Sequence, residues 1–137
     1  MALLAKTADM DDLNALMDRA RVVAARAYAP YSRFQVGCAL RTVAGGLYVG
    51  CNVENASYGL TICAERNAVF AAVSAEGQGM RIAQLAVIAL GHEFPPCGAC
   101  RQVIAEFSQA ESEVAFFQNG GLVSKSIAEL LPSAFQL

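Results

Sequence analysis

Pro96-Cys97-Gly98-Ala99-Cys100 is the stretch of sequence from which the fold is best predicted. A short continuous apolar run, Leu85–Leu90, precedes it and is typical of a strand that is covered on both faces. Pro95-Pro96 interrupts the chain, and the segment Cys97–Phe107 then predicts a helix. A buried strand followed at once by a helix indicates an α/β domain, in which helices pack against a central sheet.

The flanking segments extend this pattern in both directions. A helix is expected over Asp11–Tyr28, with Asp9 or Thr7 as its cap, because apolar residues recur there at spacings of three and four. Glycine-rich turns at Gly45-Gly46 and Asn119-Gly120-Gly121 indicate two hairpins. The remaining expected elements are strands over Gln35–Thr42, Leu47–Asn52, Val114–Phe117 and Leu122–Ser124, a buried helix over Cys63–Ala75 that is apolar nearly all round, and a short helix over Ile127–Leu131. This order predicts one domain over residues 1–137, a three-layer α/β/α sandwich with a five-stranded mixed sheet.

The composition is apolar for a chain of this size. Hydrophobic residues make up 55% of the 137 residues, and only 16% are charged. No stretch approaches the roughly 18 to 20 charge-poor apolar residues of a spanning helix, and the start of the chain lacks the pattern of a secretory signal. We therefore expect a cytoplasmic homo-oligomer, because the interfaces of obligate oligomers resemble a core cut in half.

The charge and the cysteine content narrow the class of ligand. The net charge is −2, and the ten basic residues are scattered along the chain. A nucleic-acid partner is not expected, because such binders carry a basic patch. A small uncharged ligand fits better. Five cysteines without a secretion signal indicate free thiols or metal ligands in a reducing compartment.

Cys97 and Cys100 have the C-x-x-C spacing at the first turn of a predicted helix. Side chains three residues apart share a face, so both sulfurs can reach one ion, and the helix N-terminus favours the thiolate form. Taken alone, the spacing fits a zinc site, thioredoxin-like redox chemistry or coincidence.

Cys63-Ala64-Glu65 also opens a predicted helix. Residues two apart do not share a helix face, so the pair serves one centre only if Cys63 lies at the tip and Glu65 flanks the metal. Combined with Pro-Cys-x-x-Cys downstream, it matches the signature of zinc-dependent deaminases, with cysteine as the first ligand. Three ligands leave a fourth position open for water, which predicts a catalytic Zn²⁺, one per chain.

A zinc site made only of cysteine thiolates has an unfavourable charge for catalysis. Three thiolates on Zn²⁺ leave a net charge of −1, which makes a poor electrophile. Arg66 and Arg101 directly follow Glu65 and Cys100, and each could donate hydrogen bonds to a thiolate. The alternative for each arginine is a solvated surface position.

Five segments resemble the small homotetrameric cytidine deaminases, in order and at that family's spacing. They are Tyr28-Ala-Pro-Tyr-Ser-Arg-Phe34-Gln-Val-Gly37, Asn52-Val-Glu54-Asn-Ala-Ser-Tyr58, Ile62-Cys-Ala-Glu-Arg66, Pro96-Cys-Gly-Ala-Cys-Arg-Gln102-Val and Leu130-Leu-Pro-Ser-Ala-Phe135. The resemblance spans nearly the whole chain and implies a zinc hydrolase of the cytidine and deoxycytidylate deaminase superfamily. It also implies a homotetramer with active sites at subunit interfaces.

The resemblance implies a role for each matched residue. Cys63, Cys97 and Cys100 would bind zinc, and Glu65 would shuttle protons. The residues implied in substrate binding are Asn52 and Glu54 for the ribose, Phe34 beside the nucleoside, the Ala64 backbone for the pyrimidine, and Phe135, which would stack on the base from a neighbouring subunit. Arg66 would offset thiolate charge.

The expected activity is hydrolytic deamination of free cytidine and 2′-deoxycytidine by a zinc-activated water, as in pyrimidine salvage. Within the superfamily, the alternatives are a nucleotide or another cytosine-bearing compound, such as a nucleoside antibiotic. From other classes, the alternatives are a thioredoxin-like oxidoreductase using Cys97 and Cys100, and a zinc-bearing binding module. Cys38 and Cys51 are expected to be buried thiols, and no role is assigned to His92.

Overall fold

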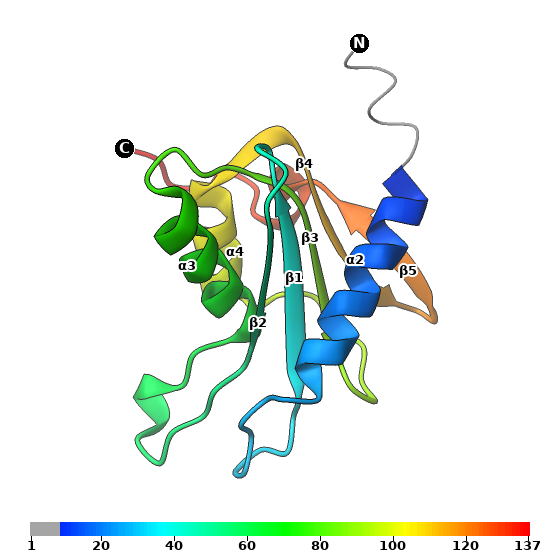
Figure 1. The fold of residues 1–137 in the computed structure, drawn as a ribbon, viewed down its shortest axis with the longest axis vertical. Helices are drawn as coiled ribbons and strands as arrows, with labels where there is room; N and C mark the ends of the chain where they lie inside the picture. Colours follow the sequence, from blue (N-terminus) through cyan, green and yellow to red (C-terminus); the bar gives the residue numbers. More distant parts are fainter. Residues whose placement is uncertain (1–8) are drawn as a thin grey trace.

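The computed structural model describes residues 9–137, which form five strands and a set of helices around them (Figure 1). The strands lie in the order β2-β1-β3-β4-β5, and neighbours are antiparallel except for β3 and β4. In chain order the elements are α2 (Asp9–Ala24), β1 (Val36–Thr42), β2 (Leu47–Cys51), η1 (Tyr58–Leu60), α3 (Ala64–Glu76), β3 (Ile82–Ala89), α4 (Gly98–Glu106), β4 (Ser108–Gln118), β5 (Gly121–Lys125) and α5 (Ile127–Leu130). The predicted fold class, with a five-stranded mixed sheet between helical layers, is confirmed.

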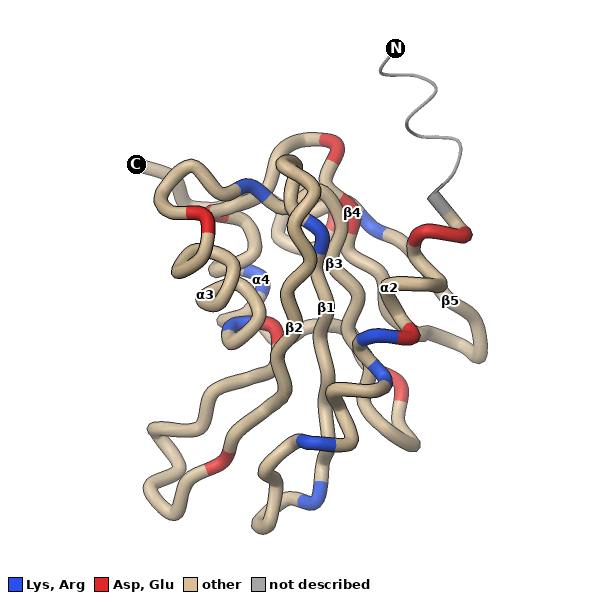
Figure 2. The backbone as a smooth tube through the Cα atoms, viewed as in Figure 1, with Lys and Arg blue, Asp and Glu red and all other residues tan. Residues whose placement is uncertain are grey.

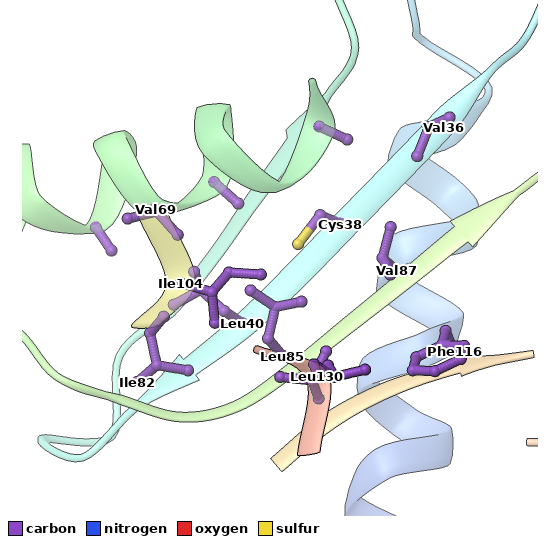
Figure 3. Packing of buried hydrophobic residues seen from close by; sticks show 14 of the residues in the cluster. Val36, Cys38, Leu40, Val69, Ile82, Leu85, Val87, Ile104, Phe116 and Leu130 are labelled. Carbon is purple, nitrogen blue, oxygen red and sulfur yellow. The ribbon is translucent and has the colours of Figure 1, made fainter. Parts of the chain in front are cut away.

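Two separate hydrophobic clusters hold the layers together. Helix α2 covers one face of the sheet, where Leu13, Leu16 and Met17 pack against alanines of β1, β3 and β4. Helices α3, α4 and α5 cover the other face over a larger cluster that contains Leu85, Ile104 and other buried side chains (Figure 3). Alternate residues of each strand therefore face different helices, which explains the nearly continuous apolar sequence of β1 and β3.

Helix α2 departs from its expected bounds at both ends. It ends at Ala24 rather than Tyr28, because Tyr28 leaves the helix and forms a bridge with Val53. Asp9 lies inside the helix and not at a cap position before it. The other proposed cap, Thr7, is outside the described residues.

Helix α3 is less buried than its apolar sequence suggests. Ala64, Ala68 and Ala72 face the sheet and are fully buried, whereas Phe70 is exposed. The expectation of burial all round is therefore wrong for the single chain. Its exposed apolar face is available for contact with another molecule.

Strand β4 starts at Ser108 rather than at Val114. Its register on β3 shifts between the pairs Ile82↔Ser108 and Gln84↔Glu113, so the added residues form an irregular start to the strand. The Ser112 hydroxyl donates to the Ile82 carbonyl at 2.6 Å and holds this start in place. Both predicted hairpins, β1–β2 and β4–β5, are present.

Charged residues are distributed over the molecule. Figure 2 shows Lys and Arg interspersed with Asp and Glu along the backbone. Among the described residues, no helix has the length and the apolar character that crossing a membrane would require.

Candidate metal centre and substrate cavity

Two helix N-termini bring three cysteines together. Cys63 is the N-cap residue of α3, and Cys97 is the N-cap residue of α4, with Cys100 in the first turn of the same helix. The two helices lie side by side on one face of the sheet (Figure 1). The three sulfur atoms are within 4.8 Å of one another. Tetrahedral Zn²⁺ with Zn–S bonds of about 2.3 Å requires sulfurs about 3.8 Å apart. The cluster therefore fits a zinc ion.

Hydrogen bonds in the cluster favour the thiolate form of Cys63. The Cys100 thiol donates toward it, and the Arg66 guanidinium donates to its Sγ at 3.2 Å; together they lower the pKa of Cys63 to about 5. The same contact and burial raise the pKa of Cys100. The backbone N–H of Cys100 also donates to Cys97 Sγ, at 3.4 Å. A bound cation would replace the proton of Cys100, because a cysteine binds metal as the thiolate.

The two arginines that follow the cysteine motifs have different contacts. Arg66 contacts Cys63, as expected for a residue that offsets thiolate charge, and its buried Nε atom has no hydrogen-bond partner among residues 9–137. Arg101 instead donates to two backbone carbonyls, those of Pro96 and Leu130, each at 2.8 Å. Arg101 therefore ties the start of α4 to the end of α5, where a sulfur contact was expected.

Glu65 lies beside the cysteines and is buried away from solvent. Its side chain is in the first turn of α3, and the residue is only 4% exposed. Burial is the main cause that raises the pKa of Glu65 to about 7, with a further contribution from the nearby Cys63. A carboxyl group of this kind can both accept and release a proton near neutral pH.

Cys63, Cys97 and Glu65 line a cavity of about 400 Å³, a size that suits a small ligand. Its wall comes from the start of β1, the connection between β2 and α3, the N-terminus of α3, and the connection between β3 and α4. The lining residues are Ser32, Phe34, Val36, Asn52, Glu54, Thr61, Cys63, Ala64, Glu65, Phe94 and Cys97. Most of the residues proposed for the site from the sequence therefore meet in one cavity.

Glu54 is fixed by the turn that precedes β1. Its carboxylate accepts hydrogen bonds from the backbone N–H groups of Tyr31 and Ser32, at 2.9 and 3.1 Å, and from the Ser32 hydroxyl. The Ser32 hydroxyl is the main cause that lowers the pKa of Glu54. Glu54 thus presents a negative charge in the cavity.

Asn52 is buried and has a structural task of its own. Its Oδ1 accepts from the Val36 N–H at 2.8 Å, and its Nδ2 donates to the Phe34 carbonyl at 2.7 Å. The side chain therefore fixes the backbone on both sides of Gln35, which sets the position of Phe34. One N–H of the amide is left for a ligand.

The two other residues implied in substrate binding, Ala64 and Phe135, lie far apart in the single chain. Ala64 starts α3 and lines the cavity. Phe135 is 69% exposed and lies against α4 beside Gln102 and Ala105, in a different cavity from Glu65. Any contact of Phe135 with a substrate therefore has to be made in another subunit.

Phe94 is one of four lining residues that were not proposed for the site from the sequence, with Ser32, Val36 and Thr61. Its ring packs edge-on against Phe34 at 5.3 Å between centroids, and His92 stacks on Phe34 at 4.2 Å. The available signal was an aromatic residue three positions before a proposed ligand, Cys97. Of the other cysteines, Cys38 is buried as expected and Cys51 is half-buried, and all five are free thiols.

Comparison with known proteins identifies the family to which the chain belongs. The model of the cytidine and deoxycytidylate deaminase zinc-binding region matches residues 10–116. The chain belongs to the cytidine and deoxycytidylate deaminase family. It is 50% identical over 110 residues to the cytidine deaminase of Halalkalibacterium halodurans, an alignment that covers 80% of this chain and 83% of that protein.

Solved structures of the family share the fold. The cytidine deaminase of Mycobacterium tuberculosis superposes with a TM-score of 0.81 at 42% identity, covering 92% of this chain and 98% of that one. The cytidine deaminase of Burkholderia pseudomallei gives a TM-score of 0.80 at 45% identity, covering 89% and 98%. With the cysteine cluster, these matches make the chain a zinc-dependent deaminase, which removes the basis for the thioredoxin-like alternative.

Proposed function

We propose that the enzyme hydrolyses cytidine and 2′-deoxycytidine to uridine and 2′-deoxyuridine, with release of ammonia, and that it serves pyrimidine salvage. One observation carries the proposal: a single cavity is lined by two of the zinc-binding cysteines, the buried acid Glu65 and the ionised Glu54. The two cysteines and Glu65 suit the attack of water on an amine-bearing carbon. Glu54 suits the hydroxyl groups of a sugar.

Zinc held by Cys63, Cys97 and Cys100 supplies the Lewis acidity that makes water a nucleophile near neutral pH. Glu65 takes a proton from the attacking water and delivers it to N3 of the cytosine ring, then takes the proton of the new hydroxyl group at C4 and passes it to the departing amine. Its raised pKa suits both steps, because the group must accept and give up a proton in each cycle. Arg66 offsets the negative charge of the thiolates through its contact with Cys63.

The substrate class follows from the charge in the cavity. Glu54 remains ionised, so it accepts hydrogen bonds from ribose hydroxyls and repels a phosphate group. A free nucleoside is therefore preferred to a nucleotide. The amide of Asn52 fixes the turn and offers one N–H to the sugar, Phe34 and Ala64 contact the base, and Phe135 of a neighbouring subunit stacks on it.

The test compares four substrates on the purified protein at equal zinc content: cytidine, 2′-deoxycytidine, deoxycytidine monophosphate and an aminoacylated cytosine nucleoside. Turnover is followed by the loss of cytosine absorbance and by ammonia release. The two free nucleosides are expected to give the highest kcat/KM. Preference for the nucleotide or for the aminoacylated compound would contradict the assignment.

Glu65→Gln tests the proton shuttle. The variant keeps the shape of the side chain and should keep one zinc per chain, yet lose about 10²- to 10⁴-fold in kcat. Glu111→Gln, at an exposed position on β4, is the matched control and should retain the wild-type rate. If Glu65→Gln turned over cytidine at the wild-type rate, the role assigned to Glu65 would be wrong.

A further inference from the structure

The connection between β3 and α4, residues 90–97, carries an aromatic side chain into the substrate cavity. Phe94 lines the cavity together with Phe34, Val36 and Cys97. Its side chain packs on Phe34 and is still 38% exposed, so part of the ring is free to contact a ligand. No step of the proposed reaction uses Phe94.

Contacts at three points hold this connection in place. A turn closes with the bridge between Ala89 and His92, and Gly91 supplies the positive φ that the turn requires. The His92 ring then stacks on Phe34. Both carboxylate oxygens of Glu93 accept from the Gly120 N–H, at 3.2 and 3.1 Å, which ties the connection to the β4–β5 hairpin. Phe94 therefore stands in a defined position before the substrate arrives.

The proposed reaction orients the base relative to this wall. The amine-bearing carbon, C4, must lie beside the cysteine cluster, and its neighbour N3 must face Glu65 on α3 to receive a proton. The other neighbour of C4 is C5, which then points away from Glu65. Glu65 enters the cavity from α3, whereas Phe94 enters it from the connection that leads into α4, three residues before Cys97.

We propose that Phe94 is a specificity-determining residue, which limits the bulk of any substituent at C5 of the cytosine ring. The inference rests on the proposed function, because the orientation of the base follows from the assigned role of Glu65. A rigid apolar wall that fits a hydrogen at C5 leaves no room for a methyl group. Discrimination of one such group in a tight pocket amounts to about 10- to 200-fold.

The test measures kcat/KM for cytidine and for 5-methylcytidine with wild type, Phe94→Ala and Phe94→Leu. The wild type is expected to prefer cytidine by about tenfold or more. Either substitution should raise the ratio of 5-methylcytidine to cytidine by about fivefold or more, with alanine giving the larger change. Phe94→Leu keeps the test valid if the alanine variant does not fold.

Val43→Ala is the control, because it trims an exposed apolar side chain of the β1–β2 hairpin that lies outside the cavity lining. Its substrate ratio should equal that of the wild type. A wild type that accepts both substrates equally, or Phe94 variants whose ratio changes by less than about fivefold, would overturn the inference. Failure of the wild type to deaminate cytidine would instead refute the proposed function, so the two failures are distinguishable.

Discussion

Arg66 and Arg101 illustrate how neighbouring residues of one motif acquire different tasks. Both directly follow a residue of the catalytic centre, and the sequence alone offers both as donors to the thiolates. Only Arg66 donates to a sulfur, at 3.2 Å, whereas Arg101 bonds to the carbonyls of Pro96 and Leu130. The first contact acts on the charge of the metal centre, and the second acts on the packing of α4 and α5.

Arg66→Gln should weaken zinc binding and catalysis. Removing the guanidinium leaves Cys63 without its cationic partner, so three thiolates carry their charge uncompensated. Loss of such an outer contact typically costs about 10- to 100-fold in metal affinity or activity. Competition with a chromogenic chelator measures the affinity, and the cytidine assay measures the rate.

Arg101→Gln is the matched comparison for Arg66→Gln. It removes two hydrogen bonds to carbonyls and should lower the thermal unfolding midpoint, while zinc affinity stays near the wild-type value. Arg19→Gln, at an exposed position of α2, serves as the neutral reference. Equal loss of zinc affinity in the Arg66 and Arg101 variants would contradict the separation of roles.

At the scale of elements, the packing of α2 on β1 depends on one glycine. A Cβ atom at Gly37 would lie 2.0 Å from the carbonyl oxygen of Ala20 and 2.6 Å from the backbone nitrogen of Ala24. These are backbone atoms of the helix, so no side-chain rotation relieves the clash. The helix axis itself would have to move away from the sheet.

Gly37→Ala is therefore expected to lower the free energy of unfolding by about 1–3 kcal/mol, as overpacking of a tight interior typically does. Urea unfolding at one fixed protein concentration measures the loss. Gly79→Ala is the control, because a Cβ at Gly79 meets no atom within 4 Å. Equal unfolding midpoints for the two variants would show that α2 and β1 tolerate a methyl group between them.

The sequence predicts those elements whose own residues determine them. Cys63, Cys97 and Glu65 are proposed from the sequence because metal and acid chemistry restricts residue type and spacing. The start of β4 was missed because apolar and polar side chains do not alternate between Gln109 and Glu113. The strand there depends instead on pairing with β3. The end of α2 was missed for a similar reason, since Tyr28 is drawn into pairing with Val53.

The same distinction applies within the substrate cavity. Asn52 was proposed as a sugar ligand, yet the bonds of its amide to Val36 and Phe34 exist only in the folded chain. Phe94 enters the cavity because Glu93 and His92 hold the connection around it. Roles that depend on tertiary contacts can therefore be recognised only in the structure. The candidate zinc-binding cysteines can be proposed from the sequence.

At the scale of the whole molecule, large apolar side chains remain on the surface of the single chain. Tyr58 is 76% exposed, Leu60 64% and Phe135 69%, and Phe70 adds an exposed ring on α3. Tyr58 and Leu60 lie on η1, next to residues that line the cavity, whereas Phe135 lies beyond α5. An assembly that covers these groups would bury apolar surface and complete the site in one step.

In a homotetramer whose active sites are shared between subunits, two inactive variants should restore activity when they are assembled together, whereas monomers would not. Glu65→Gln and Phe135→Ala should each be poorly active alone, because each damages every site. After the two are dissociated and reassembled together, about a quarter of the sites would combine an intact Glu65 with an intact Phe135 from a neighbour. Activity should therefore rise well above the sum of the separate variants, and sedimentation should give four times the monomer mass. A monomeric mass, or no recovery in mixed assemblies, would contradict the proposal that Phe135 of a neighbouring subunit completes the site.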